Sequence, residues 1–334
     1  MSINILAIES SCDDTSASVC QDGKILSNLI ANQEIHRAYG GVVPELASRA
    51  HEENIVPVVD QAMKKAKVDL KDLNAIAFTL GPGLLGSLLV GSSFGKALAL
   101  SLDIPIIAVH HMKAHVLAHF IDDPKPDFPF LCLTVSGGHT QIVLVKNHLE
   151  MEVIGHTIDD AAGEAFDKTA KMLGFPYPGG PLIDKNAKLG DPLAFKFARP
   201  RVPELNYSFS GLKTSVLYFI QKQQKENPSF VENNLADLSA SIQHTIIEIL
   251  FKTLLMATKK TGIKRVAIAG GVSANSGLRA RLQQVGQEQG WETFIPQFQY
   301  CTDNAGMIAI SAYYQYLAKD FAGQEVIPKA RFGF

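Results

Sequence analysis

Two histidines, four residues apart, are the side chains in this sequence best suited to metal chemistry. His111 and His115 follow the apolar, β-branched run at residues 106–109 and lie in a segment whose composition favours a helix. Residues at positions i and i+4 project from one face of a helix, so both imidazoles can bind one metal ion. Histidine pairs at this spacing also occur in proteins without a metal, and two ligands do not hold a divalent ion. The rest of the chain must therefore supply a third ligand.

A carboxylate or a thiolate at the end of a helix or strand is the expected third ligand. Asp303 is the first choice, because it opens the predicted final helix and its oxygens can turn outward. The alternative is that Asp303 or Thr302 only caps that helix, and the local sequence does not decide between these roles. Two histidines and one carboxylate leave coordination positions open, which suits Fe(II) and catalytic Zn(II). We expect the histidines of one half of the molecule to meet Asp303 of the other half across a cleft.

Three turns of small and polar residues are candidates for binding an anion. The turn at residues 136–140 has two glycines at its centre, so its backbone N–H groups can approach a phosphate or a carboxylate. The segment 9–15 can do the same and adds Asp13 and Asp14. The glycines at 270–271 follow a predicted strand and precede a helix, which places N–H groups toward a phosphate. Each turn alone could be an ordinary one, but three in one chain favour nucleotide chemistry.

The composition indicates a chain of two lobes with a large buried core. The chain has 334 residues and is 46% hydrophobic, and this length exceeds the size at which one core usually stops growing. The formal net charge of −2 gives no overall basic surface, so any contact with nucleic acid needs a local patch or the surface of a partner. The basic residues between 185 and 201 are one candidate, although a solvated loop explains them more simply.

Cysteine usage and hydropathy indicate a soluble protein. The four cysteines are scattered without Cys-x-x-Cys spacing, which fits reduced thiols. The apolar run at 3–8 is too short for a signal peptide and is followed at once by acidic residues. The weakly charged stretch at 74–95 is divided by Gly-Pro-Gly at 81–83 into pieces too short to span a membrane. We therefore expect no membrane segment.

A repeated pattern of strands indicates two lobes of one α/β fold. A strand, a polar turn, a strand, a turn and a third strand are predicted within residues 3–30 and again within 130–155. Short strands can also recur by coincidence. The pattern predicts an N-terminal lobe at 1–125 and a C-terminal lobe at 126–334, the second with an irregular, Gly- and Pro-rich insertion at about 175–215.

Helices are predicted between these strands. Pro44 begins a long helical pattern, in which Pro57 should kink or split the helix. Asp159 and Asp160 are expected to cap a helix at 161–173.

Nine segments, in order along nearly the whole chain, resemble the catalytic subunit of the bacterial tRNA threonylcarbamoyladenosine synthase, once called the O-sialoglycoprotein endopeptidase family. They are residues 9–15, 40–45, 81–83, 111–115, 135–140, 159–168, 208–214, 270–275 and 301–304. The resemblance implies the duplicated two-lobe fold of actin, heat-shock chaperones and sugar kinases (ASKHA). It also implies that the threonylcarbamoyl group moves from threonylcarbamoyl-adenylate to N6 of the adenosine just after the anticodon, in tRNAs that read codons starting with A, with release of AMP.

The resemblance further implies roles for individual residues. It assigns His111, His115 and Asp303 to a divalent metal ion, Fe(II) first and Zn(II) as the alternative. The residues that it assigns to the adenylate or its threonyl portion are Thr134, Val135, Ser136, Gly137, Gly138, Asp167, Gly180, Asp184 and Asn275. Asp13 or Asp14 is the expected acceptor of the N6 proton, and Asp14 stands where some relatives have Glu.

The implied partners are tRNA, through its anticodon stem-loop, a paralogous ASKHA subunit and an ATPase subunit, all in the cytoplasm. A metalloprotease would need Glu directly after the first histidine, and Met112 stands there instead. An ASKHA-fold kinase or ATPase is the alternative function, because the glycine turns suit ATP equally well. Phosphoryl transfer, however, does not require paired histidines.

Overall fold

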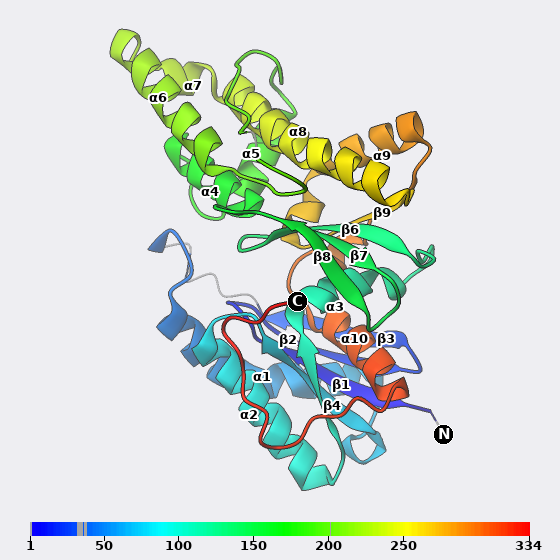
Figure 1. Cartoon of the computed structure of the whole chain (residues 1–334). Helices are drawn as coiled ribbons and strands as arrows, with labels where there is room; N and C mark the ends of the chain where they lie inside the picture. Colours follow the sequence, from blue (N-terminus) through cyan, green and yellow to red (C-terminus); the bar gives the residue numbers. More distant parts are fainter. Residues whose placement is uncertain (1, 32–35, 37–38, 201) are drawn as a thin grey trace. The chain divides into compact units, whose positions relative to one another are not determined.

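The structure is a computed structural model that describes residues 2–31, 36, 39–200 and 202–334, and it divides into two compact units (Figure 1). The first unit comprises Met1–Pro126, Lys146–Met151 and Pro296–Phe334, and the second comprises Asp127–Val145 and Glu152–Ile295. The predicted lobes at 1–125 and 126–334 differ from this division for residues 126, 146–151 and 296–334, of which the last segment is by far the longest. Residues 296–334 belong to the first unit because the last long helix packs on the sheet of that unit.

A five-stranded mixed sheet forms the centre of the first unit. Its strands, in spatial order, are β3 (Lys24–Ala31), β2 (Thr15–Gln21), β1 (Asn4–Glu9), β4 (Ala75–Gly81) and β5 (Ile106–His110). The first three strands form an antiparallel meander, whereas β4 and β5 run parallel to β1. Along β1, Ile5 and Ala7 belong to one hydrophobic core and Leu6 and Ile8 to another, so the sheet is buried on both faces.

The sheet of the second unit repeats this plan. Its strands, in spatial order, are β8 (Met151–His156), β7 (Thr140–Val145), β6 (Phe130–Val135), β9 (Arg265–Ala269) and β10 (Glu292–Phe294). When β6–β10 are matched in sequence to β1–β5, both sheets have the same strand order, and β6–β7 and β6–β9 repeat the antiparallel and parallel pairings of β1. The repeat predicted from the sequence is therefore confirmed.

Helices cover both faces of the first sheet. They are α1 (Pro44–Ala66), α2 (Leu85–Leu102), α3 (His111–Leu117) and α10 (Ala305–Leu317), with short 3-10 helices at Leu70–Asp72, Ala118–Phe120 and Phe298–Tyr300. Apolar residues of α1 and α2 pack on one face of the sheet, and those of α3 and α10 pack on the other. The sheet therefore lies between two layers of helices.

The helix α1 continues through Pro57 without a break, so the predicted split does not occur. Proline leaves the carbonyl of the residue four positions earlier without its helical partner. That residue is Glu53, and both Glu53 and Pro57 are exposed, so water can bond to the free carbonyl. The helix therefore tolerates proline on its solvent-facing side.

Among the described helices, α2 alone has the length and apolar composition that would allow it to cross a membrane. One side of α2 is nevertheless buried in the first unit, where its glycines allow close packing. A Cβ atom at Gly91 would lie 2.2 Å from the hydroxyl oxygen of Ser10, and one at Gly95 would lie 2.9 Å from the ring of Phe78. This close packing explains why α2 is rich in small and apolar residues: it is a core helix of the first unit.

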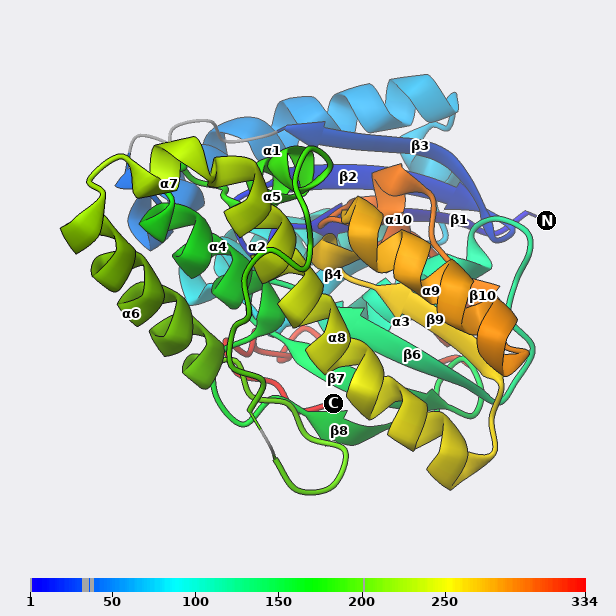
Figure 2. The ribbon, with the colours of Figure 1, turned by 90° about the horizontal axis from the view of Figure 1, so that it is seen from above.

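The helices of the second unit are α4 (Ala162–Met172), α5 (Gly180–Ala187), α6 (Ser210–Glu226), α7 (Phe230–Asn233), α8 (Leu235–Thr261) and α9 (Ser276–Gln289), with a 3-10 helix at Gly271–Ala274. Figure 2 shows α8 and α9 lying over the second sheet, and residues of both belong to the core of this unit. The insertion predicted at 175–215 contains α5 and the first turn of α6.

The helix α4 begins without the predicted aspartate cap. Its N-cap residue is Ala161, and no side chain bonds there. The carboxylate of Asp159 instead accepts hydrogen bonds from the backbone N–H of Phe209 at 2.8 Å and the hydroxyl of Ser210 at 2.7 Å. Asp160 forms an ion pair with Lys168 at 3.0 Å. Both aspartates are therefore used in contacts outside the helix start, and the predicted caps were wrong.

Candidate active site

Two histidines and an aspartate converge in the first unit. The ligand atoms of His111, His115 and Asp303 all lie within 4.8 Å of one another, and among the described residues no other such group of His, Cys, Asp or Glu is found. Nε2 of His115 lies 3.2 Å from Oδ1 of Asp303, and Nε2 of His111 lies 3.5 Å from the same oxygen. The three side chains predicted to share a metal ion are thus brought together.

The path of the chain explains this convergence. The helix α3 follows β5 and carries both histidines on one face, while Asp303 comes shortly after β10 and directly before α10. Since β5 and β10 are corresponding strands of the repeat, the ligands arise at corresponding places in the two halves of the sequence. The expectation that Asp303 belongs to the other half of the molecule was wrong, because residues 296–334 fold into the first unit with the histidines.

Asp303 is not the cap of the helix that follows it. The N-cap of α10 is Asn304, whose side-chain oxygen accepts a hydrogen bond from the backbone N–H of Met307 at 3.0 Å. The predicted alternative, in which Asp303 or Thr302 performs only this role, is therefore wrong. The Asp303 carboxylate is directed to the histidines instead, and its side chain is 30% exposed, which leaves one side of the group open.

Glu9 is a member of this site that the sequence analysis treated only as part of a polar turn. Its side chain is fully buried, and Oε2 lies 3.1 Å from Nδ1 of His111. The same carboxylate accepts hydrogen bonds from the hydroxyl of Thr79 at 2.7 Å and from the backbone N–H of Ser11 at 2.5 Å. An acidic residue at the end of a fully buried strand was the available signal, because such a carboxylate requires partners.

Electrostatics within the cluster favour positive charge between the carboxylates. Burial opposes the charged form of His111, but Asp303 and Glu9 outweigh it and raise the pKa of that imidazole to about 10. Burial would raise the pKa of Asp303, yet His111 and His115 hold it well below its usual value. Burial lowers the pKa of His115, which favours the neutral imidazole that a metal ion requires.

The residues present fit a divalent metal ion. Two imidazole nitrogens and one carboxylate oxygen are a donor set that Fe(II) and Zn(II) both accept. A carboxylate bonded to the second nitrogen of a liganding histidine is the usual support of such a site, and Glu9 occupies that position beside His111. The cluster therefore has the ligands and the supporting group that a metal centre needs.

Asp13 and Asp14 also lie in the first unit, in the loop between β1 and β2, and both are half-buried. This loop is held by His51, whose Nε2 lies 3.0 Å from the carbonyl oxygen of Cys12 and whose Nδ1 lies 2.8 Å from the hydroxyl of Thr15. Burial raises the pKa of the Cys12 thiol, and the nearby charges of Asp303 and Asp13 add to the shift. The loop therefore lies close enough to the metal-ligand cluster for the charge of Asp303 to act on Cys12.

The predicted substrate-binding residues lie in the second unit. Thr134 and Val135 end β6, Ser136, Gly137 and Gly138 form the turn to β7, Asp167 lies on α4, Gly180 and Asp184 lie on α5, and Asn275 caps α9. Oδ1 of Asp167 accepts hydrogen bonds from the N–H groups of Gly179 and Gly180 at 2.9 and 3.0 Å. Asp184 accepts hydrogen bonds from the hydroxyl and N–H of Ser276. These contacts link α4, α5 and the start of α9.

Two of the three glycine turns pack together in this unit. A Cβ atom at Gly270 would lie 2.5 Å from the carbonyl oxygen of Val135, and one at Gly163 would lie 2.5 Å from that of Ser136. Gly137 and Gly138, by contrast, have no atom within 4 Å of an added Cβ. The turn after β6 is therefore fixed on one side and open on the other. The third turn, at residues 9–15, belongs to the first unit.

The chain is similar to proteins of one described family over nearly its whole length. The family described as tRNA N6-adenosine threonylcarbamoyltransferase matches residues 24–310. A protein of that description from Christiangramia forsetii is 63% identical over 335 residues, which cover 99% of this chain and 98% of the relative. Another, from Cytophaga hutchinsonii, is 60% identical over 331 residues and covers 99% of this chain and 96% of the relative.

Among solved structures, the HypF protein of T. kodakarensis matches with a TM-score of 0.61 and 15% identity. The match covers 97% of this chain and 49% of HypF, so the chain spans about half of that protein. This likeness concerns the fold alone. Together with the two repeated sheets, it confirms the predicted two-lobe α/β fold of the ASKHA class.

Proposed function

Since the chain belongs to the tRNA N6-adenosine threonylcarbamoyltransferase family, we propose that His111, His115 and Asp303 hold a divalent metal ion in this transferase. The enzyme transfers the threonylcarbamoyl group of threonylcarbamoyl-adenylate to N6 of the adenosine 3′ to the anticodon, in tRNAs that read ANN codons, and releases AMP. The observation that carries the metal proposal is the convergence of three ligand atoms within 4.8 Å.

We assign Fe(II) as the ion, with Zn(II) as the alternative. Both accept two imidazoles and one carboxylate as ligands, and the Asp303 side chain is 30% exposed, so a substrate could reach an ion that these residues would hold. When bound, such an ion supplies a Lewis acid that polarises a carbonyl oxygen. The protein's part is to hold the three ligands in place, and buried Glu9 supports this arrangement through His111.

The second unit is the proposed site for the adenylate. The open turn Ser136–Gly138 offers backbone N–H groups to the phosphate, and the fixed packing of Val135 against Gly270 holds that turn in position. We assign Thr134, Asp167, Gly180, Asp184 and Asn275 to the nucleoside and threonyl portions. The half-buried Asp167, whose pKa is raised by burial, already accepts two backbone N–H groups that keep it oriented.

Proton transfer from N6 is the proposed task of Asp13 or Asp14. In the reaction, N6 forms a bond to the carbonyl carbon of the threonylcarbamoyl group, and the bond from that carbon to the phosphate oxygen breaks. AMP departs with the bonding electrons, and one proton of N6 moves to the carboxylate. A test is single-turnover transfer by Asp14→Asn and Asp13→Asn with prebound adenylate. If both variants match wild type, another group accepts the proton.

The proposed partners beyond tRNA are a paralogous ASKHA subunit and an ATPase subunit, in the cytoplasm. Support comes from the family resemblance and from the exposed side of α2, where Leu85 is 50% and Leu89 is 44% exposed. The alternative function, an ATP-dependent kinase or ATPase of the same fold, is not favoured, because the curated relatives are named as transferases of the threonylcarbamoyl group.

The assay that separates these functions omits ATP. Purified protein, alone and with its paralogous subunit, is mixed with threonylcarbamoyl-adenylate and unmodified tRNA, and the modified nucleoside is measured by mass spectrometry. Modification without ATP supports the transferase, whereas ATP consumption with a small acceptor and no tRNA product contradicts it. Metal analysis of anaerobically prepared wild type beside His111→Ala tests the ligand assignment, which predicts one ion per chain in the wild type only.

A further inference from the structure

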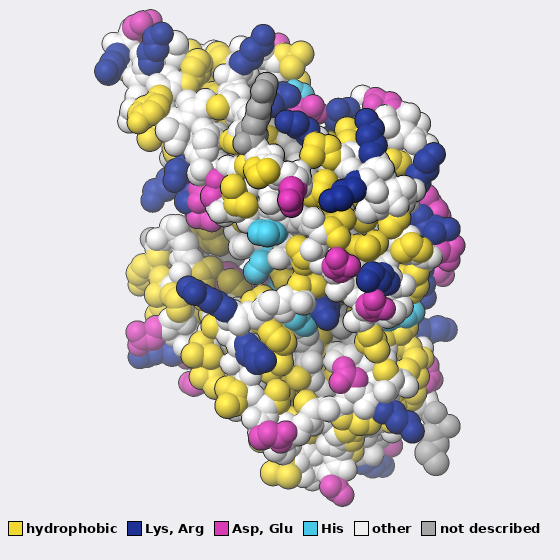
Figure 3. Space-filling model, viewed as in Figure 1, with side chains coloured by type: hydrophobic (Ala, Val, Ile, Leu, Met, Phe, Trp, Pro, Cys, Tyr) yellow, Lys and Arg dark blue, Asp and Glu magenta, His cyan; other side chains and the backbone are white. Residues whose placement is uncertain are grey.

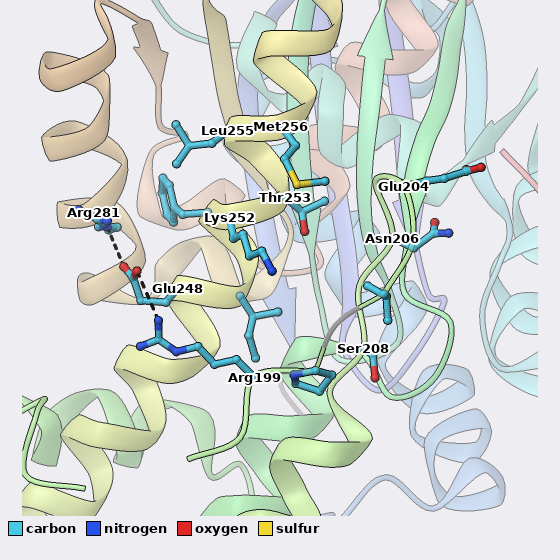
Figure 4. Close-up of a pocket in the computed structure, with 14 residues that line it drawn as sticks. Arg199, Glu204, Asn206, Ser208, Glu248, Lys252, Thr253, Leu255, Met256 and Arg281 are labelled. Atoms are coloured by element: carbon cyan, nitrogen blue, oxygen red, sulfur yellow. Dashed lines mark ion pairs between the residues drawn. The ribbon is translucent and has the colours of Figure 1, made fainter. Parts of the chain in front are cut away.

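A cavity of about 320 Å³ lies in the second unit, and none of the residues proposed above to bind the metal ion or the adenylate lines it (Figure 4). Its walls come from α8, from Arg281 on α9 and from residues 199, 200, 202, 204, 206 and 208. The wall residues include apolar side chains such as Val202, Ile249 and Met256, and polar ones such as Asn206 and Thr253. A cavity with apolar walls and a few polar groups is a binding site for an amphipathic group.

Positive charge predominates in this cavity. Glu248 lies between two guanidinium groups, 3.0 Å from Nε of Arg281 and 3.9 Å from an amino nitrogen of Arg199. Lys252 has no carboxylate partner among the described residues, and Figure 4 shows it pointing from α8 into the space. The second acid, Glu204, is drawn pointing away from Lys252. The cavity is therefore lined by three cations and two carboxylates, and one of these carboxylates, that of Glu248, is shared between Arg199 and Arg281.

Glu248 orients the cations more than it neutralises them. A guanidinium has five N–H donors. One terminal nitrogen of Arg199 faces Glu248 at 3.9 Å and the other contacts Nε2 of His244 at 3.3 Å, which leaves further donors of Arg199 available. The side chain of Arg199 is 49% exposed, so a ligand can reach it from solvent. Glu248 thus lies beside two arginines at the edge of the cavity, near Lys252, for which the described part of the chain records no carboxylate partner.

We propose that this cavity binds one phosphate of the tRNA backbone and the nucleoside attached to it. The inference rests on the proposed function, in which tRNA is the substrate. A phosphate meets Arg199 and Lys252, while a ribose or base contacts the apolar wall and can bond to Asn206 and Thr253. A nucleotide of single-stranded RNA has an anionic phosphate for the cations and a base and ribose for the apolar wall, so it matches both features of the cavity.

The charge of the whole chain makes a local site of this kind necessary. The net charge is −2, and on the face drawn in Figure 3 the Lys and Arg side chains alternate with Asp and Glu rather than forming one basic surface. RNA affinity depends on cations that replace the counterions of its phosphates. A protein without a general basic surface contacts RNA through cations gathered at particular places or through a partner's surface, and this cavity is one such place.

The test compares two double variants of the same net charge. Arg199→Ala with Lys252→Ala removes the cavity cations, and Lys259→Ala with Lys260→Ala removes two exposed lysines at the end of the same helix that do not line the cavity. Affinity for an unmodified tRNA transcript is measured by fluorescence anisotropy at several salt concentrations. The cavity variant should bind at least about tenfold more weakly, with the salt slope reduced by about 0.7, as expected for the loss of one phosphate contact to a single strand.

Four further results decide the interpretation. In turnover, the cavity variant should show a raised KM for tRNA and an unchanged kcat, while metal content and thermal stability match those of the control variant. Equal tRNA affinity and salt slope in the two variants would overturn the proposal. Saturable binding of inorganic phosphate that is lost in the cavity variant, with tRNA binding intact, would also overturn it and assign the cavity to a small anion. Failure of the wild type to bind or modify tRNA would instead contradict the proposed function.

Discussion

The fully buried carboxylate of Glu9 lies 3.1 Å from Nδ1 of His111, whose other nitrogen, Nε2, faces Asp303. A carboxylate at Nδ1 keeps the proton on that nitrogen, so the lone pair of Nε2 remains available to a metal ion. Thr79 and Ser11 each donate to Glu9, and these bonds stabilise the carboxylate without a proton. The position of the first ligand thus depends on a residue that does not itself touch the ion.

Replacement of Glu9 by glutamine should weaken metal binding by about 10- to 100-fold without unfolding the protein. The amide is neutral and can present an N–H to Nδ1 of His111, which favours the tautomer that cannot bind a metal through Nε2. The measurement is an anaerobic titration of metal-free protein with Fe(II), followed by calorimetry. Thr79→Val, which removes one hydrogen bond but keeps the carboxylate, should have the smaller effect. Equal affinity of Glu9→Gln and wild type would contradict this role.

Asp303 and Asn304 are neighbours with separate tasks, and substitution should separate them. Asp303→Ala removes a ligand, so the bound metal and the transfer activity should both be lost. Asn304→Ala removes the cap of α10, which should lower the free energy of unfolding by about 1 kcal/mol while the metal content is kept. Metal analysis and urea denaturation of both variants check this. Asn304→Ser, which can still cap, should recover most of the stability, and loss of metal in Asn304→Ala would refute the division of tasks.

The same two residues show how far the sequence leads. Local pattern predicted the strands, both halves of the repeat and the histidine pair, because alternation and i, i+4 spacing are properties of a few consecutive residues. Thr302, Asp303 and Asn304 are all capable caps, and only the contacts of the folded chain select Asn304. Those contacts depend on the return of residues 296–334 to the first unit, which no local pattern reports.

Glu9 and Arg199 illustrate the second limit. Each acquires its role from residues far away in sequence, Glu9 from His111 and Arg199 from Glu248. The sequence shows an acidic residue at the end of a strand and an arginine in an irregular segment, and neither pattern identifies the residue that the side chain contacts. The predicted aspartate cap of α4 failed for the same reason, because Asp159 is used by Phe209 and Ser210.

His51 should make the stability of the first unit depend on pH. Burial lowers the pKa of its imidazole below the value of 6.5 in an unfolded chain, so the folded protein holds it neutral. Below about pH 6.5 this histidine binds a proton in the unfolded chain but stays neutral in the folded protein. Protonation therefore favours the unfolded state, and the free energy of unfolding falls as the pH decreases from that value. Above about pH 6.5 His51 is neutral in both states, so the stability that depends on the neutral imidazole is fully present.

The substitution His51→Gln isolates this effect. Glutamine can donate to the carbonyl of Cys12 and accept from Thr15 but does not titrate, so its stability should depend less on pH than that of the wild type. Urea denaturation at pH 7.5, 6.5 and 5.5 gives the comparison, and the advantage of wild type should shrink toward pH 5.5. Thr15→Val, which removes one hydrogen bond, should lower stability by a similar amount at each pH. Parallel curves for wild type and His51→Gln would show that His51 does not cause the dependence.

Gly270 and Gly271 should respond oppositely to alanine, although they are adjacent in one turn. Gly270 has φ +84°, and an added Cβ would lie 2.5 Å from the carbonyl oxygen of Val135. Backbone strain alone costs about 1–3 kcal/mol at such a position, and the collision adds to it. Gly271 has no atom within 4 Å of an added Cβ, so Gly271→Ala should be neutral or slightly stabilising.

Because Val135 leads into the turn Ser136–Gly138, the collision in Gly270→Ala should also displace the proposed phosphate site. Urea denaturation measures the loss of stability, and calorimetric titration with AMP measures the site. Gly270→Ala should unfold at lower urea concentration and bind AMP more weakly, whereas Gly271→Ala should match the wild type in stability. If Gly270→Ala were destabilised but bound AMP normally, the close contact would support the fold of the second unit without positioning the turn that follows β6.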